Sequence, residues 1–311
     1  MASYAIYNYQ FERIIHLGHK QMELDFFPPT VITDAEWEKR LETFREVFKK
    51  IYSGNDGIFK MGRSTYVSHI IFEKDNLAVM KFGRLSNKHF NDAQLKEHKV
   101  DDYPWCYVIW DNRDGMQRML IEQKPSAWPN SKKMTGTRKV AKALSAIADE
   151  WLAVKNGMHF SYGDGPVYKS DDFWDYVKLY PNGFKRVYFS FPPPNLGRLM
   201  DLADNFVAIR NETGGGIDAD LKASKGGVLK LVPENPQTKS LVDLSSACGS
   251  EVKAYPKDGH TVIRISGDNL DNDVAVEVPD ELIPILTSPQ LFNEMNYSTF
   301  VEIVNSVKNL Y

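Results

Sequence analysis

The chain has 311 residues, of which 42% are hydrophobic and 25% are charged, and its formal net charge is -3. These values are ordinary for a folded protein and exclude the disordered and fibrous classes. The length suits about two domains, each large enough to bury its own core without disulfides or metals. The two cysteines, Cys106 and Cys248, are too few for a disulfide framework or a four-cysteine zinc site, and they fit a reducing compartment.

The sequence predicts no transmembrane helix. The longest stretch without Asp, Glu, Lys or Arg runs from Leu282 to Asn293, whereas a membrane-spanning helix needs about 20 apolar residues. The N-terminus alternates polar and aromatic residues, and it lacks the basic start and apolar centre of a signal peptide. We therefore expect a cytoplasmic protein.

Charge is distributed unevenly along the chain. Residues 1–160 hold 24 Lys and Arg against 20 Asp and Glu, a net +4, whereas residues 161–311 hold 14 against 21, a net -7. The densest positive stretch, from Gln123 to Ala148, contains no acidic residue and six basic ones: Lys124, Lys132, Lys133, Arg138, Lys139 and Lys142. Such a stretch either contacts an anion or forms a solvated loop and helix face.

The first half predicts an antiparallel sheet with two helices. Strand composition and turn residues predict strands at 4–11, 66–72, 77–82, 105–110 and 116–122, the last four forming two hairpins. Capping-box spacing and apolar residues at helical spacing predict a helix at 34–52. A second amphipathic helix follows the basic loop and ends at Asn156-Gly157.

The second half predicts a smaller sheet. Gly and Pro residues punctuate 163–183, which indicates a linker between one domain at 1–162 and another at 184–311. The segments that follow predict strands at 184–191, 217–223, 250–255, 260–266 and 273–278, and helices at 195–209, 238–248 and the C-terminus. This order suits a split β-α-β-like sheet with helices on one face, so the fold class is α+β in two domains.

The most enzyme-like segment is GGGIDADLKA, residues 214–223. Strand periodicity places Asp218, Asp220 and Lys222 on one face. A metal-dependent nuclease would use such carboxylates to hold Mg²⁺ and the lysine to stabilise charge, with a further carboxylate from Asp201, Asp204 or Glu212. A half-solvated strand shows the same alternation. The nuclease is therefore the alternative interpretation. Only under this alternative do we expect a cofactor, which is Mg²⁺.

Nucleic-acid binding explains the basic stretch. Lys and Arg neutralise phosphates, and an exposed aromatic ring such as Trp128 stacks on a base. The expected binding residues are Lys124, Trp128, Lys132, Lys133, Arg138, Lys139 and Lys142, and the surface is extended by Lys81, Arg84, Lys88, Lys96 and Lys99. The sequence has no signature for reading bases, so we expect sequence-independent binding, and these residues leave DNA and RNA both open. The competing interpretation places Trp128 in the core.

Four segments resemble a known family in their order: YAIYNYQF, STYVSHIIFEKDNLAVMKF, YVIWDNRDG before the basic loop, and RVYFSFPPPNLGRLMDLADNF. This layout, which covers much of the chain, is similar to that of the RexA-type sensor proteins of phage exclusion and, by extension, of accessory proteins of bacterial anti-phage defence. The likeness lies in the order of elements and carries over no functional residue, and the long Gly/Pro-punctuated linker departs from it. It implies a non-enzymatic, oligomeric component that binds or senses DNA and acts with a partner protein.

The sequence thus predicts a nucleic-acid-binding or sensing component without a cofactor. The last helix presents Phe300, Val304, Val307 and either Leu310 or Tyr311 on one side. Because two-fold dimers are the commonest soluble oligomers, we expect a homodimer that uses this end of the chain.

Overall fold

The computed structural model describes residues 2–13, 42, 58–113, 117–131, 134–156, 158–163, 165–191, 217–258, 262–266, 275–278 and 294–306. Several expectations fall outside these residues: the helix at 195–209, the helix at 34–52 apart from Glu42, and the basic pair Lys132 and Lys133.

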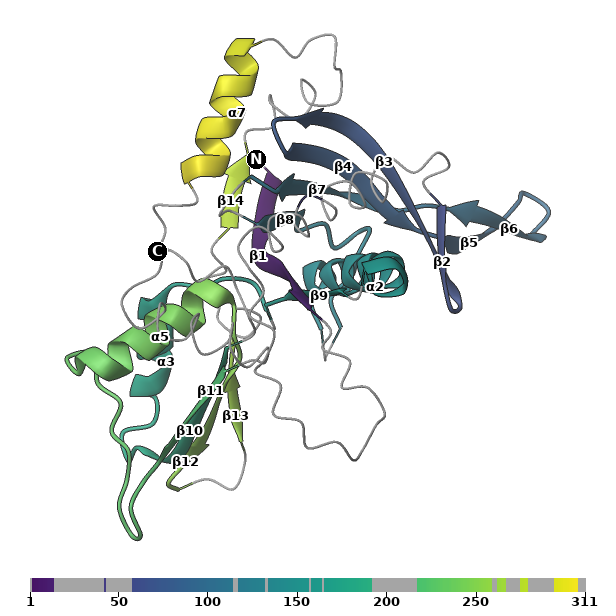
Figure 1. The fold of residues 1–311 in the computed structure, drawn as a ribbon. Helices are drawn as coiled ribbons and strands as arrows, with labels where there is room; N and C mark the ends of the chain where they lie inside the picture. Colours follow the sequence, from purple (N-terminus) through teal and green to yellow (C-terminus); the bar gives the residue numbers. More distant parts are fainter. Residues whose placement is uncertain are drawn as a thin grey trace, which may run out of the picture.

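The larger sheet is antiparallel and holds eight strands. Seven follow the order β14-β1-β8-β7-β4-β3-β2, and β9 pairs with the second half of β1 (Figure 1). The strands are β1 (Ala2–Arg13), β2 (Ile58–Met61), β3 (Ser64–Lys74), β4 (Leu77–Arg84), β7 (Trp105–Asp111), β8 (Arg118–Glu122), β9 (Met158–Tyr162) and β14 (Ala275–Val278). The opening strand and both hairpins are confirmed. Asp75 and Asn76, with φ of 52° and 62°, form the tight turn between β3 and β4.

A helix packs on each face of this sheet (Figure 1). Helix α2 (Gly136–Asn156), predicted from its apolar stripe, buries Val140, Leu144 and Ile147 against one face. Helix α7 (Glu294–Ser306) buries Phe300 and Val304 against the other. Because strand residues alternate between faces, strands β1, β3, β4, β7 and β8 contribute to both cores.

The C-terminal elements join the first sheet rather than the second. The sequence placed strand 273–278 in the smaller sheet, but β14 pairs with β1, with Val278 opposite Ala2. The terminal helix was expected to form a homodimer through its apolar side. Phe300 and Val304 are instead 0% and 1% exposed within the chain's own core, and Val307 and Leu310 lie outside the described residues.

The smaller sheet has the order β11-β10-β12-β13, with neighbouring strands antiparallel. Its strands are β10 (Phe184–Phe191), β11 (Ile217–Lys222), β12 (Val252–Pro256) and β13 (Ile263–Ile265). Strands β11 and β12 therefore run parallel on either side of β10 and are joined through α5 (Pro236–Cys248), which is a split β-α-β unit. Asn235 caps α5 by accepting from Thr238 N, and Gly249 ends it in a left-handed conformation.

Helices α3 (Ser170–Lys178) and α5 lie on one face of this smaller sheet, and of these two the sequence predicted only α5 (Figure 1). Helix α3 occupies the segment that the sequence assigned to a linker, and Phe173 and Val177 pack into the core beneath it. The overall architecture is thus α+β, and the division into two domains stays a prediction.

One hairpin stands apart from both sheets. Strands β5 (Ser86–Asn91) and β6 (Glu97–Asp102) pair only with each other and project from the end of the first sheet (Figure 1). We call residues 86–102 the arm. The sequence did not predict it, because its strands are rich in Asn, Lys, His, Asp and Glu, which are not typical of strands.

Candidate functional site

Trp128, the expected stacking residue, is buried. Its side chain is 4% exposed, and its ring lies parallel to those of Phe82 and Tyr66, with centroid distances of 5.8 and 6.3 Å. A ring must be accessible to stack on a base. The structure therefore supports the competing interpretation, in which Trp128 belongs to the core.

The loop that carries Trp128 is fixed against the start of α2. A Cβ at Gly136 would lie 1.9 Å from the Trp128 carbonyl oxygen, so only glycine permits this approach. Gly136 N donates to Asn130 Oδ1 at 2.7 Å, and the Lys139 ammonium donates to the Pro129 carbonyl. Lys139 therefore helps to hold the loop as well as carrying charge.

The basic stretch does not form one continuous surface. Arg138, Lys139 and Lys142 lie on α2, which covers one face of the first sheet. The ammonium of Lys124 lies 3.8 Å from the ring centroid of Trp105, and Trp105 packs against the core of the opposite face. The sheet thus separates Lys124 from the basic residues of α2.

A different group of residues gathers around Trp105. The ammonium groups of Lys81 and Lys124 lie 4.4 and 3.8 Å from its ring centroid. Tyr107 meets the ring edge-on at a centroid distance of 4.9 Å. Lys81 lies opposite Tyr107 on one side and His69 on the other, so their side chains share a face. We call His69, Lys81, Trp105 and Lys124 the Trp105 cluster.

The lysines of the Trp105 cluster contact an aromatic ring and, within the described part of the chain, no acidic side chain. Among the described residues, no carboxylate lies within ion-pair distance of Lys81 or Lys124. The nearby carboxylate of Glu122 accepts a hydrogen bond from Tyr107 N at 2.8 Å. Burial raises the pKa of the neighbouring Cys106 thiol, so this group stays neutral. Two cations over one partly exposed ring suit a ligand that combines an anionic and a planar group.

Sequence reasoning named Lys81 and Lys124 but missed Trp105, which it assigned only to a hairpin strand. Alternation along β7 does place Trp105, Tyr107 and Ile109 on one face. The pairing of Gly83 with Trp105 and of Lys81 with Tyr107 then brings β4 alongside them. That register depends on a sheet-wide arrangement and has no local signal.

The suspected nuclease residues lie on one face of edge strand β11, as predicted. Arg186 donates to both Asp220 oxygens at 2.7 and 2.9 Å, and Lys222 lies 3.0 Å from the same carboxylate. These hydrogen bonds, chiefly that from Arg186, hold the pKa of Asp220 below its ordinary value. The hydroxyl of Tyr188 bonds to Asp218, which raises the pKa of Tyr188. Both carboxylates therefore have protein partners.

A metal centre is not assembled in the described part of this face. No three His, Cys, Asp or Glu side chains come together there as metal ligands. The proposed third ligands, Asp201, Asp204 and Glu212, lie outside the described residues. The remaining cations on the face are also paired, because Arg264 and Lys253 lie 2.8 and 3.9 Å from Glu251.

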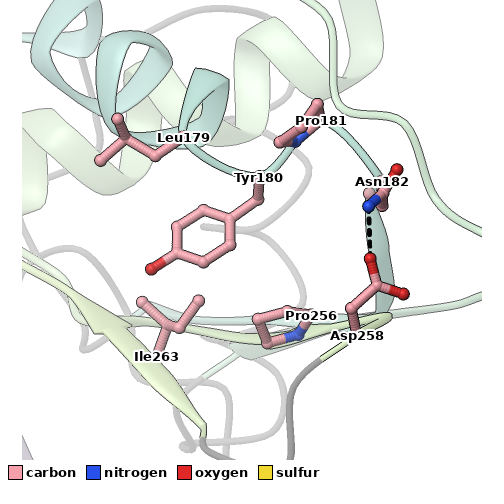
Figure 2. Close-up of a pocket in the computed structure, with 8 residues that line it drawn as sticks. Leu179, Tyr180, Pro181, Asn182, Pro256, Asp258 and Ile263 are labelled. Carbon is pink, nitrogen blue, oxygen red and sulfur yellow. Dashed lines mark hydrogen bonds between the residues drawn. The ribbon is translucent and has the colours of Figure 1, made fainter.

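One pocket lies at the end of α3, beside β12 and β13 (Figure 2). Its volume is about 460 Å³, and it is lined by residues 179–183 together with Pro256, Asp258 and Ile263. The Asn182 amide donates to the Asp258 carboxylate at one side, whereas Leu179, Tyr180 and Ile263 make the other side apolar (Figure 2). The sequence analysis did not find this pocket, because its walls come from segments far apart in the chain.

Comparisons with known proteins give no match. No family model matches the chain, and neither a curated protein nor a solved structure is significantly similar to it. Of the helices described, none is both long enough and apolar enough to cross a membrane.

Proposed function

We propose that this protein is a nucleic-acid-binding or sensing component that contacts its ligand through the Trp105 cluster. The observation that carries the proposal is the position of two lysine ammonium groups over one tryptophan ring, with no carboxylate partner among the described residues. This narrows the basic surface expected from sequence to residues on strands β3, β4 and β7 and the loop that follows β8.

The physical argument rests on how easily these lysines exchange partners. A cation–π contact at an exposed site is worth about 0.5–1 kcal/mol, so a phosphate can replace the ring as a lysine's partner at small cost. The ring then becomes accessible to a base, and base stacking on an aromatic side chain is worth about 1–3 kcal/mol. Neither interaction reads a base edge, so binding is independent of sequence and weakens with salt.

The wider role follows the layout resemblance. A non-enzymatic, cytoplasmic component of a bacterial anti-phage defence system would use this surface to detect nucleic acid, with DNA favoured, and pass the signal to a partner protein. Lys142, exposed on α2, and Arg138 add positive charge on the other side of the sheet.

The test is fluorescence anisotropy with labelled single-stranded DNA, duplex DNA and RNA at two salt concentrations, with and without Mg²⁺. Lys81→Gln with Lys124→Gln should weaken binding. The fall of log K with log salt on duplex DNA should also become less steep, by about 0.9 for each phosphate that the variant no longer neutralises. The matched control is Lys222→Gln with Lys253→Gln, which removes equal charge from the second sheet.

An equal loss of affinity in both double variants, or no loss in the first, would reject the Trp105 cluster. Cleavage in Mg²⁺ that disappears in Asp220→Asn would favour the nuclease alternative instead.

A further inference from the structure

The tip of the arm exposes a leucine in an uncommon conformation. Leu95 is 83% exposed, more than the other large apolar side chains that the structure leaves in solvent. Its φ is 60°, in the left-handed region that bulky residues rarely adopt. Single exposed leucines are common on proteins, but such a backbone at an exposed leucine points to a role for its position.

The turn around Leu95 is fixed by Asp92. One oxygen of this carboxylate accepts from the backbone N–H groups of Gln94 and Lys96, both at 2.9 Å, and the other lies 2.6 Å from His98 Nε2. Leu95 N donates to the Asp92 carbonyl at 2.9 Å. These bonds lower the pKa of Asp92, chiefly through His98. The arm therefore presents Leu95 in a preorganised conformation, which reduces the entropy lost on docking.

The pocket beside α3 offers a matching apolar surface. Leu179 at its edge is 68% exposed, and Tyr180, Pro256 and Ile263 line the interior (Figure 2). The backbone that forms it is closely packed, because a Cβ at Gly183 would lie 2.5 Å from the Leu229 carbonyl oxygen. Lys257 N also donates to the Gly183 carbonyl at 2.9 Å. The pocket is thus built into the fold.

Charge at the two places is complementary. Lys96, directly after Leu95, is exposed and has no carboxylate partner among the described residues. Asp258, at the side of the pocket, is also exposed, and its one described partner is the neutral amide of Asn182. An apolar tip with a cation therefore matches an apolar pocket with a carboxylate.

The arm cannot fill the pocket of its own chain. The arm projects from the first sheet, whereas the pocket lies at the far side of the second sheet, at the opposite end of the molecule (Figure 1). We therefore propose that Leu95 docks into the pocket of a second copy. Because arm and pocket are different surfaces, the contact is head-to-tail, and repeating it produces a ring or an open chain.

This inference is independent of the proposed nucleic-acid site and replaces the two-fold homodimer expected through the last helix. A hairpin tip in a pocket covers less than the roughly 1,200–2,000 Å² of a stable interface. Self-association is accordingly expected to be weak and to rise with protein concentration.

The experiment is sedimentation velocity over a concentration series on the wild type, Leu95→Asp and Leu179→Asp, with circular dichroism to check the fold. Both substitutions are at exposed positions, so folding should be preserved. Ile58→Asp, at an exposed apolar residue of edge strand β2, is the matched control. We expect the wild type and the control to associate, and each of the other two variants to stay monomeric.

Mixing the two variants gives the sharpest result. Leu95→Asp retains an intact pocket and Leu179→Asp an intact arm, so an equimolar mixture should form heterodimers and nothing larger. The proposal is overturned if the wild type is monomeric throughout, if Leu95→Asp or Leu179→Asp associates as the wild type does, if Ile58→Asp abolishes association equally, or if the mixture stays monomeric.

Discussion

The two sheets differ in how they arrange their surface charges. On the open face of the second sheet, Arg186 and Lys222 share Asp220, and Lys253 and Arg264 share Glu251. On the first sheet, Lys81 and Lys124 lie over Trp105, and no carboxylate of the described residues lies within ion-pair distance of them. The cation-rich appearance of a surface is thus a poor guide to anion binding, and the presence or absence of partners is the better one.

The physical reason is the cost of exchanging partners. An arginine held by both oxygens of a carboxylate must break two charge-assisted hydrogen bonds before it binds a phosphate. A lysine over an aromatic ring breaks only a weak interaction. Local charge density along the sequence gives no information on this difference, because the partners come from neighbouring strands.

The largest expected effect comes from the packing of α7 on the first sheet, beneath Trp105. Phe300, fully buried, packs on the same core cluster that supports Trp105. Phe300→Ala should lower the free energy of unfolding by about 3–5 kcal/mol, because it leaves a cavity. Urea unfolding measures the change, and Glu302→Ala, at an exposed position of α7, should stay within about 0.5 kcal/mol of wild type. Equal, small effects would show that α7 does not pack on this sheet.

Much of the fold could be predicted from local patterns. The strands of the two hairpins around 66–82 and 105–122, helix α2 and the split β-α-β character of the second sheet follow from periodicity, turn residues and capping. The pairing of β14 with β1 could not be predicted, because it joins residues at the two ends of the chain. The polar arm was missed because its strands lack apolar alternation and instead carry polar side-chain pairs such as His89 with Glu97.

The candidate site was less predictable than the fold. Lys124 was identified from its basic neighbours, yet the described ones on α2 lie on the other side of the sheet. Trp128 was interpreted as a binding residue because it lies in the acid-free basic stretch, but Phe82 and Tyr66, distant in sequence, pack against it. Asp218, Asp220 and Lys222 do share a face, as alternation requires, but Arg186 on the neighbouring strand determines what Asp220 does.

A smaller effect is expected when the second sheet loses the carboxylates that pair with its cations. Asp220→Asn with Glu251→Gln removes the carboxylates that pair with Arg186, Lys222 and Lys253, so this sheet should gain anion binding. We expect roughly tenfold tighter binding to duplex DNA at low salt. The fall of log K with log salt should become steeper by about 0.9 for each additional phosphate that the variant neutralises. Anisotropy measures both.

Lowering the pH to 5 should not produce the same gain in DNA binding, because Asp220 should remain ionised. Its pKa lies below the ordinary value, so at pH 5 the carboxylate is still charged and still holds Arg186. If Asp220→Asn with Glu251→Gln binds duplex DNA no more tightly than the wild type, the ion pairs are not what keeps the second sheet from binding anions.

Lysine footprinting tests the central claim most directly, because it compares the two sheets in one sample. The protein is acetylated briefly with and without saturating single-stranded DNA, and the modification of each lysine is quantified by mass spectrometry. We predict that nucleic acid protects Lys81 and Lys124, and leaves Lys222 and Lys253 as reactive as in the free protein. Protection of Lys222 and Lys253 instead, or of neither pair under conditions of saturated binding, would contradict the assignment of the Trp105 cluster as the nucleic-acid site.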